Sequence, residues 1–280
     1  MPEPVLTPEG TRVDAPSAGR HVLSDSLQAL RVWRVWYFLG LQDIRSRFKR
    51  SAIGPLWIFV NMFMFVGGAG VLYGVMINQP MKEMLPYLVA GFPIWGAIVS
   101  SLTESGWAFV NAEGYIKQFC FPKQIYLLRT FVSMTAILFL TLCAVIPVQL
   151  YFRSFSVAGW LLAAPGLALL LLAMLGHITL SAYLGVRFRD FPHAAGGLLQ
   201  IAFFVTPVMF PAQILHDRHL ALVYRLNPFY YLLEVARGPI LRGSMPAADT
   251  YAFAALYVML VWVFAAVIAR SLDSRVVLLL

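Results

Sequence analysis

The sequence predicts an all-α integral membrane protein with six transmembrane helices, an N-terminal amphipathic interfacial helix and re-entrant helices between spans five and six. Of its 280 residues, 60% are hydrophobic and only 12% are charged, and the mean hydropathy is +0.75. A soluble domain carries about 25% charged residues, so most of this surface must face something other than water. Long charge-free stretches lead to the same conclusion, because a bilayer core about 30 Å thick needs about 20 apolar residues in a helix.

The N-terminal region divides into a tail and a helix. Residues 1–22 contain Pro, Gly, Ser and scattered charge without periodicity, which predicts a mobile tail. Residues 23–52 follow a helical period, with Trp33, Tyr37 and Leu41 on one face and Arg34, Arg45 and other polar residues on the opposite face. Aromatic residues opposite a basic face are typical of a helix that lies in the headgroup region and contacts membrane lipids.

The six spans are predicted near residues 53–77, 85–109, 124–149, 158–185, 193–212 and 250–270. Together they form a transmembrane domain over residues 53–270, followed by a C-terminal tail over residues 271–280. Charge-free runs mark most of them, because charged groups and unpaired backbone groups are costly in hydrocarbon. The Ile53-Gly54-Pro55 step turns the chain into the first span.

Two charges lie inside the predicted spans. Glu104 and Arg129 stand twelve or thirteen residues to either side of the turn that joins spans two and three. An antiparallel hairpin sets them at similar depth, which predicts an intramembrane ion pair, because a lone charge there is costly. The alternative is that Arg129 reaches lipid phosphates and Glu104 faces a pore alone.

The stretch before the last span, about residues 213–243, is too apolar for a solvated loop and too interrupted for a full span. Two short helices fit it best, broken at Asn227-Pro228 and ended at Gly238-Pro239. Such broken segments persist at membrane depth only where protein covers them or where they line a cavity. They are candidates for an outer gate, with the residues Asn227, Pro228, Tyr230 and Tyr231.

The basic residues indicate the orientation of the chain. Net charge is +8, and an even number of spans places both termini on one side. If that side is the cytoplasm, 15 of the 21 Lys and Arg residues lie on inner segments, including the Arg45–Arg50 cluster beside the first span. We therefore expect both termini in the cytoplasm, and lipid headgroups explain the positive charge better than nucleic acid does.

The sequence lacks the residues that several kinds of catalysis and ligand binding require. The sequence has no phosphate-loop motif, no H-E-x-x-H and no nucleotide-binding Gly fingerprint, and its two cysteines form no metal-ligand pattern. We therefore predict no catalytic residues, no metal site and no cofactor bound by this chain. The middles of spans one, three, four, five and six carry no Asp, Glu, Lys or Arg, which argues against ion-coupled transport.

The spans are instead rich in aromatic residues. Aromatic faces stack on apolar or sugar-ring faces without imposing charge, which makes them candidates for lining a channel. Packing and interfacial anchoring are the alternative role for any one of them. The candidate channel residues are Trp57, Phe59, Phe63, Trp95 and Phe203.

The order of residues around the first span resembles a known family. Gln42-Asp-Ile-Arg-Ser-Arg-Phe-Lys-Arg-Ser-Ala-Ile-Gly-Pro-Leu-Trp57 is similar to the first-span region of ABC-2-type permeases that export O-antigen, capsule and teichoic-acid polysaccharides. Val186-Arg-Phe-Arg-Asp-Phe191 and Leu226-Asn-Pro-Phe-Tyr-Tyr-Leu232 match further family patches. The Asn-Pro patch is shared with ABC-2 drug exporters, so it supports the superfamily more than the substrate.

This resemblance implies a bacterial inner-membrane exporter of a lipid-linked polysaccharide, O-antigen favoured. It implies a homodimer bound to two copies of a separate ATPase, which would hold ATP and magnesium. It also implies a cytoplasmic coupling segment over residues 111–119, with Asn111, Glu113, Gly114, Tyr115 and Lys117. We expect the substrate lipid to approach beside the interfacial helix, at Arg31, Trp33, Arg34, Trp36 and Tyr37.

Two other functions stay open at this point. The first is an ABC-2 drug or lipid exporter of the same architecture. The second is an integral membrane glycosyl- or acyltransferase, which needs catalytic carboxylates or histidines at the membrane surface. The outer candidates for such a site, Glu83, Asp217, Glu234 and Asp249, are scattered along the sequence.

Overall fold

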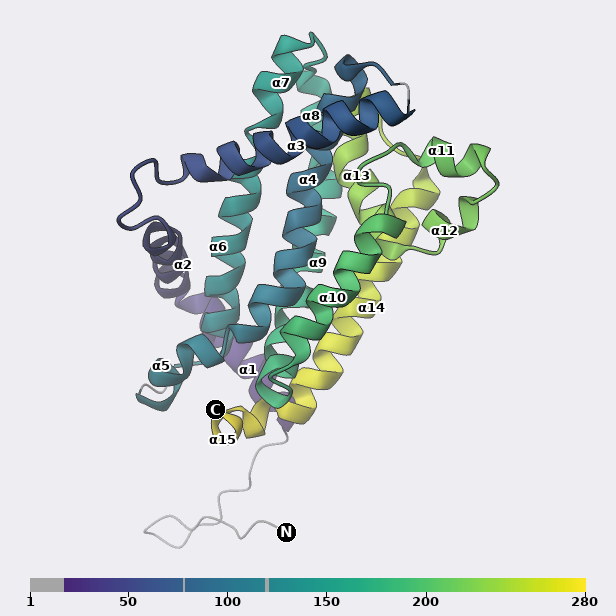
Figure 1. The fold of residues 1–280 in the computed structure, drawn as a ribbon. Helices are drawn as coiled ribbons and strands as arrows, with labels where there is room; N and C mark the ends of the chain where they lie inside the picture. Colours follow the sequence, from purple (N-terminus) through teal and green to yellow (C-terminus); the bar gives the residue numbers. More distant parts are fainter. Residues whose placement is uncertain (1–17, 78, 119–120) are drawn as a thin grey trace, which may run out of the picture.

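The computed structural model describes residues 18–77, 79–118 and 121–280, and every regular element in those ranges is helical (Figure 1). This confirms the predicted all-α fold. The longer helices are α1 (Ala18–Arg31), α2 (Trp33–Arg47), α3 (Leu56–Ile77), α4 (Met81–Thr103), α6 (Gln124–Leu142), α9 (Ala164–Arg187), α10 (Phe191–Val205), α13 (Pro228–Arg242) and α14 (Ala248–Leu272). The shorter ones are η1 (Glu104–Trp107), η2 (Val110–Ala112), α5 (Glu113–Gln118), α7 (Val145–Tyr151), α8 (Val157–Leu162), α11 (Ala212–Asp217), α12 (Ala221–Arg225), η3 (Asp273–Arg275) and α15 (Val276–Leu279).

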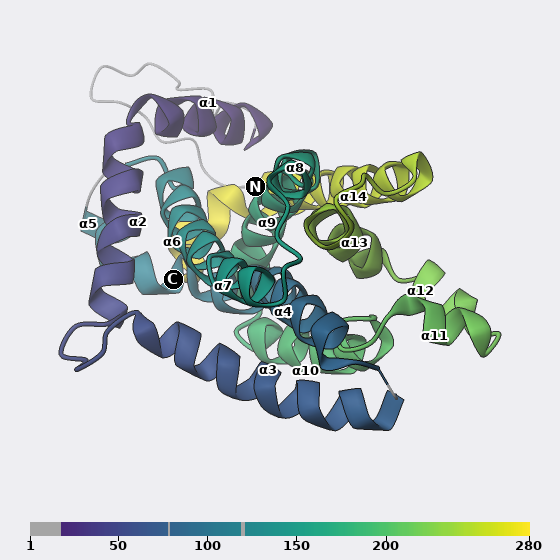
Figure 2. The ribbon, with the colours of Figure 1, turned by 90° about the horizontal axis from the view of Figure 1, so that it is seen from above.

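Helices α4, α6, α9, α10 and α14 run along a common direction and form a bundle, which Figure 2 shows from one end. α4 lies at its centre and contacts α3, α6, α9, α10 and α13. Its residues Leu88, Ile94 and Ile98 are fully buried, as are Leu170 and Met174 of α9. Most of α4 is therefore packed between other helices.

Five helical segments are long and apolar enough to cross a membrane: Leu56–Met76, Met81–Trp107, Gln124–Tyr151, Val157–Arg187 and Ala248–Leu279. The segment predicted as span five contains only the shorter helix Phe191–Val205. Its 15 residues rise about 22 Å, less than a bilayer core. The helix ends there because Thr206 precedes Pro207 and is held in extended backbone. Six spans therefore stay a prediction.

Helix α3, predicted as the first span, lies across one end of the bundle instead of along it (Figures 1 and 2). It carries no charged residue, yet Met64 is 71% exposed and Val75 is 78% exposed. An exposed apolar surface of this length requires lipid or another protein surface to cover it.

The N-terminal region differs from the prediction in two respects. The predicted tail over residues 1–22 lies outside the described residues up to residue 17, and residues 18–22 already belong to α1. The predicted single helix over residues 23–52 is two helices, α1 and α2, which meet at Val32 and point in different directions (Figure 2). Val32 has a non-helical ψ of 39°, although no Pro or Gly marks the break.

The predicted C-terminal tail is helical and packed. Val276 is fully buried, and Asp273 accepts a 2.7 Å hydrogen bond from the Tyr183 hydroxyl of α9. Lys123, which immediately precedes α6, has its Nζ 3.1 Å from the second carboxylate oxygen of Asp273. These contacts hold the chain end against the bundle, at the same end as α5 (Figure 1).

Candidate functional site

The outward face of α2 carries the aromatic residues that were predicted to meet lipid. Trp33 and Tyr37 are exposed, with ring centroids 6.2 Å apart, and the Arg34 guanidinium lies 5.8 Å from the Trp33 ring centroid. Trp36 differs from them, because its indole N–H donates a 2.9 Å hydrogen bond to the Ala29 carbonyl. Trp36 therefore fixes the corner between α1 and α2, whereas Trp33 and Tyr37 are exposed, and their contact with lipid stays a prediction.

The opposite edge of α2 packs against α6. A Cβ on Gly40 would lie 2.8 Å from the Arg129 carbonyl oxygen, so only glycine permits this approach. One turn further on, both nitrogens Nε and Nη2 of Arg129 donate to the Asp43 carboxylate, at 2.6 and 2.5 Å. At the end of α2, Arg47 Nη2 lies 2.6 Å from Glu104 Oε2. Two ion pairs thus tie α2 to the bundle.

These contacts correct the predicted Glu104–Arg129 pair. In the structure Glu104 pairs with Arg47, and Arg129 pairs with Asp43. The physical reason is that α2 folds back along the bundle and presents one opposite charge to each of the two residues. When the hairpin of spans two and three is considered without α2, Glu104 and Arg129 have only each other as an opposite charge at similar depth.

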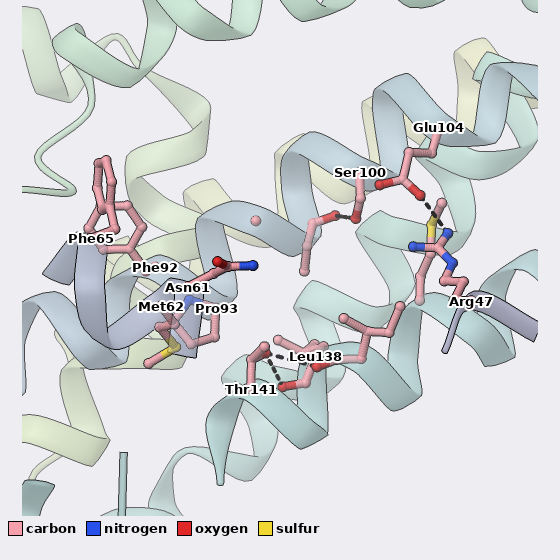
Figure 3. A pocket seen from close by; sticks show the side chains of 14 residues that line it. Arg47, Asn61, Met62, Phe65, Phe92, Pro93, Ser100, Glu104, Leu138 and Thr141 are labelled. Atoms are coloured by element: carbon pink, nitrogen blue, oxygen red, sulfur yellow. Dashed lines mark hydrogen bonds and ion pairs between the residues drawn. The ribbon is translucent and has the colours of Figure 1, made fainter. Parts of the chain in front are cut away.

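Two cavities adjoin these ion pairs. One, of about 360 Å³, is lined by both pairs together with polar groups such as Ser46 and Asn111. The other, of about 410 Å³, begins at Arg47 and Glu104 and extends past Ser100 to Phe92 and Phe65. Figure 3 shows the ion pair at one end of this second cavity and the two phenylalanines at the other.

An unbroken series of ring contacts crosses the bundle. Trp95 of α4 lies 5.8 Å from Phe203 of α10 and 5.9 Å from Phe229 of α13, measured between ring centroids. Two predicted channel residues, Trp95 and Phe203, are therefore together. The other three, on α3, are absent from the ring contacts recorded for the described residues, and Trp57 and Phe63 are exposed while Phe59 is half-buried. The series runs Phe65–Phe92–Phe203–Trp95–Phe229–Tyr257–His177.

Helix α13 begins where the sequence predicted a break. The Asn227 side chain accepts a 3.0 Å hydrogen bond from the Phe229 amide, and its Nδ2 donates to Thr206 Oγ1 at 2.6 Å. Asn227 thus caps α13 and joins it to the end of α10. Pro228 stands at the first helical position, which suits its fixed φ.

The predicted gate tyrosines face the short helices that precede α13. The Tyr230 ring packs 4.9 Å from the Tyr224 ring, and the Tyr231 hydroxyl donates a 2.7 Å hydrogen bond to the Arg225 carbonyl. The Tyr231 ring also lies 4.9 Å from Phe253 of α14. The two tyrosines therefore hold α12 beside α13 and α14.

The end predicted for this segment at Gly238-Pro239 is wrong, because α13 continues to Arg242. Pro239 removes the amide that would bond the Val235 carbonyl, yet that carbonyl oxygen lies against Gly166 of α9, where a Cβ would overlap it. Close packing on α9 therefore holds the helix through the proline. It ends at Gly243, whose φ of 66° is left-handed.

A buried charge network on α13 was missed by sequence reasoning. The Arg237 side chain is 1% exposed and lies 3.2 Å from Glu234 Oε2, while Arg242 lies 2.5 Å from Glu234 Oε1. The Arg237 guanidinium also stands 4.0 Å from the Tyr87 ring centroid and donates a 3.1 Å hydrogen bond to the Pro207 carbonyl. The Tyr87 hydroxyl donates to the same carbonyl at 2.9 Å. Arg237 thus connects α13, α4 and the segment after α10.

His177 is the one histidine well inside a predicted span, and it joins three helices. Its Nδ1 lies 3.0 Å from Ser101 Oγ of α4, and its Nε2 lies 2.7 Å from the Tyr257 hydroxyl of α14. Both ring nitrogens have partners, so its role is hydrogen-bonded packing. In the described residues no group of three His, Cys, Asp or Glu residues could hold a metal ion.

The predicted coupling segment forms η2 and α5 up to Gln118, while residues 119–120 lie outside the described residues. Lys117 Nζ lies 2.6 Å from Glu113 Oε1, one helical turn away. This hydrogen bond from Lys117 lowers the pKa of the Glu113 carboxyl below its ordinary value. Asn111, Gly114 and Tyr115 are exposed on the same projection, so the segment presents side chains outward from the end of the bundle.

The long apolar helices define a multi-pass integral membrane protein. No protein-family model matches the chain. The O-antigen export system permease protein RfbA of Myxococcus xanthus is 25% identical over 225 residues, which cover 79% of this chain and 86% of the relative. The permease of the same name from Klebsiella pneumoniae is 23% identical over 210 residues, covering 73% and 79%. These relatives confirm the predicted resemblance to polysaccharide-export permeases.

Proposed function

We propose that the chain is the membrane-spanning permease subunit of an ATP-driven exporter that moves a lipid-linked polysaccharide, O-antigen favoured, from the cytoplasm to the periplasm. The observation that carries this proposal is the similarity to two O-antigen export permeases over about three quarters of the chain. The five long apolar helices agree with it, because such a subunit must span the bilayer.

The energy for transport would come from two copies of a separate ATPase, which would hold ATP and magnesium. The sequence supports this division of labour, because it contains no Gly-Lys pair and therefore no phosphate-loop motif. A second copy of the permease would complete the assembly as a homodimer. The exposed apolar surface of α3 supports this part of the proposal, since lipid or a second subunit has to cover it.

The chain would lie in the bacterial inner membrane with both termini in the cytoplasm. The bias of Lys and Arg toward the inner segments supports this orientation. In Figure 1 the helices at the two chain ends, α1 and α15, lie toward the same end of the bundle as α5. The outer end would then carry α11 and α12, beside the candidate gate.

Transport would proceed from the α2 side of the bundle toward the gate. The lipid end of the substrate would approach beside Trp33 and Tyr37, and the sugar chain would pass through a neutral, aromatic channel at the axis of the dimer. Aromatic faces allow sugar rings to slide without fixed charge, which suits a repeating polymer. Thr206 and Asn227 would hold the outer end of this route closed until the ATPase acts.

Helix α5 would transmit motion from the ATPase by surface contact. Because Glu113 and Lys117 pair with each other, the double exchange Glu113→Lys with Lys117→Glu keeps a pair within the helix while it exchanges the two charges on the surface. We expect this variant to insert normally but to export far less polysaccharide. Export can be measured as surface O-antigen in cells, with insertion measured by membrane fractionation. Normal export by the exchanged variant would exclude contact through these two charges.

The first test of the proposal as a whole is ATP hydrolysis. Purified alone, the chain should hydrolyse no ATP above background, and a complex with its ATPase should hydrolyse ATP faster when lipid-linked polysaccharide is added. The matched control is the same complex with the Walker lysine of the ATPase replaced. Sustained hydrolysis by the permease alone would contradict the proposed division of labour.

A further inference from the structure

A third cavity lies between α1, α6, α9 and α14. α1 contacts α6 and α14, and α9 contacts both of these helices as well, so the four helices surround the space. Its volume is about 410 Å³, within the range of about 300–1,000 Å³ that is typical of small-molecule sites. In Figure 2, α1 lies on the opposite side of the bundle from α3. None of the described lining residues belongs to α2, α5 or α13, so the cavity is separate from the features that the export proposal uses.

The lining of this cavity favours an uncharged ligand. Among the described residues that line it, none has a charged side chain. An ion that entered would lose its water without gaining a partner of opposite charge. Four polar groups on the lining already donate their hydrogen atoms to oxygen atoms of the protein, at 2.7 to 3.0 Å. They are the hydroxyls of Ser26, Thr179 and Tyr183 and the indole N–H of Trp262.

Gln124, the first residue of α6, differs from these polar residues. It is only 6% exposed, yet neither its Nε2 nor its Oε1 has a hydrogen-bond partner in the described part of the chain. A buried amide without partners is costly, and native proteins pair almost all such groups. Because both atoms are unpartnered, the finding holds whichever way the amide is turned. A ligand in the cavity can supply both partners.

The cavity has a polar end and an apolar end. Gln124 and Tyr183 lie at the same end, because Tyr183 and Lys123, the residue before Gln124, both contact Asp273. Leu175 precedes Tyr183 by eight residues on α9, about 12 Å along the helix axis. Most of the other described lining residues are aliphatic or aromatic. An amphiphile can therefore place its head group at Gln124 and its chain along α9.

We propose that this cavity binds a single-chain amphiphile whose uncharged head group is a carboxamide or a protonated carboxyl. Such a head group presents a hydrogen-bond acceptor and a donor side by side, so it can pair with Nε2 and Oε1 of Gln124 at the same time. An ester accepts a hydrogen bond but donates none, so the acyl ester of a bulk phospholipid leaves Oε1 unpaired. The bound ligand would join α1 to α6, α9 and α14. This inference goes beyond the proposed function, because it requires neither the ATPase nor the polysaccharide.

The test is direct binding of octanamide to the full chain in nanodiscs of phosphatidylcholine, with empty nanodiscs as the blank. Octanamide should bind the protein, and methyl octanoate, which lacks the donor, should bind about fivefold more weakly. Equal binding of the two would mean that the cavity accepts any acyl chain, and the proposal would fail. Binding of octanamide no greater than in the blank would mean that water satisfies Gln124, and the proposal would fail in the same way.

Competition against bound octanamide distinguishes the sources of the head group. Displacement by octanoic acid would identify a protonated fatty acid as a ligand that a membrane itself can supply, whereas no displacement would restrict the ligand to carboxamides. Octyl sulfate has the same chain and a permanent negative charge, so it should not displace octanamide. Displacement by octyl sulfate would contradict an uncharged site.

Substitution of Gln124 separates binding from stability. Gln124→Met keeps the length of the side chain and removes both polar atoms. This variant should bind octanamide about tenfold more weakly and should lose the preference for the amide over the ester. Without ligand it should unfold at the same temperature as the unmodified chain or a higher one, because an unpartnered buried amide is gone. Unchanged binding by Gln124→Met would overturn the proposal.

Two further variants place the ligand. Thr135→Val removes another unpartnered buried polar atom of α6, one that does not line the cavity, and it should bind octanamide as the unmodified chain does. An equal loss of binding in Thr135→Val and Gln124→Met would mean that the effect is not local to the cavity. Ala266→Phe fills the cavity from α14 and leaves Gln124 in place. It should abolish octanamide binding, and full binding by this variant would put the ligand elsewhere and refute the assignment.

Discussion

Replacing Arg237 by Met should destabilise the protein more than any other single charge removal in the chain. Its guanidinium is fully buried and bonds Glu234, the Pro207 carbonyl and the Tyr87 ring together. Loss of one partner of a buried pair costs about 3–5 kcal/mol, and we expect about 3 kcal/mol here because Arg242 still holds Glu234. The measurement is thermal unfolding in detergent. At each temperature, the folded fraction is the fraction of protein that elutes as a monodisperse peak.

Two comparisons make this prediction specific. Arg242→Gln removes a side chain that is 52% exposed, so it should cost less than about 1 kcal/mol. The double variant Glu234→Leu with Arg237→Met removes both buried charges and should recover much of the lost stability. If Arg237→Met unfolds at the same temperature as Arg242→Gln, the buried network contributes little and α13 is held by apolar packing alone.

Reversing either charge of the Asp43–Arg129 pair should release α2 and lower stability, and reversing both should restore it. The single changes Asp43→Arg and Arg129→Asp place like charges together at a site where two hydrogen bonds were made. We expect a loss of about 1–2 kcal/mol for each, since the pair is partly exposed and partly screened. The double change should restore most of the lost stability. The midpoint temperature of thermal unfolding measures this stability.

The matched control is the swap of Glu104 and Arg129, which the hairpin geometry alone would favour. The double change Glu104→Arg with Arg129→Glu places like charges beside both Arg47 and Asp43. The losses of stability from the two single changes should therefore add. If this swap restores stability and the Asp43–Arg129 swap does not, then α2 does not dock on α6 in the membrane.

The membrane class and the positions of most long helices follow from composition, because a charge-free run of 20 residues has few alternatives. The break at Asn227-Pro228 was also predictable, since Asn caps helices and Pro favours the first turn. The direction of α3 was not predictable. An apolar stretch indicates burial in lipid or protein, but it contains no information about the angle between the helix and the bundle. The corner at Val32 has no Gly or Pro to mark it.

The missed ion pairs have a common cause. Sequence spacing showed Glu104 and Arg129 at equal depth, but their partners come from α2, which is more than fifty residues away from Glu104 in the chain. The spacing of Glu234 and Arg237 by three, inside a segment too apolar for a loop, was the available indication that they share a buried helix face.

The most direct test of the central proposal is translocation into sealed vesicles. The permease is reconstituted with its ATPase, lipid-linked O-antigen is supplied on the ATPase side, and the sugar that reaches the lumen is protected from an added glycosidase. We expect protected sugar to accumulate only with hydrolysable ATP and only when both proteins are present. Equal accumulation without the ATPase, or none in a complex that hydrolyses ATP, would contradict an ATP-driven polysaccharide exporter.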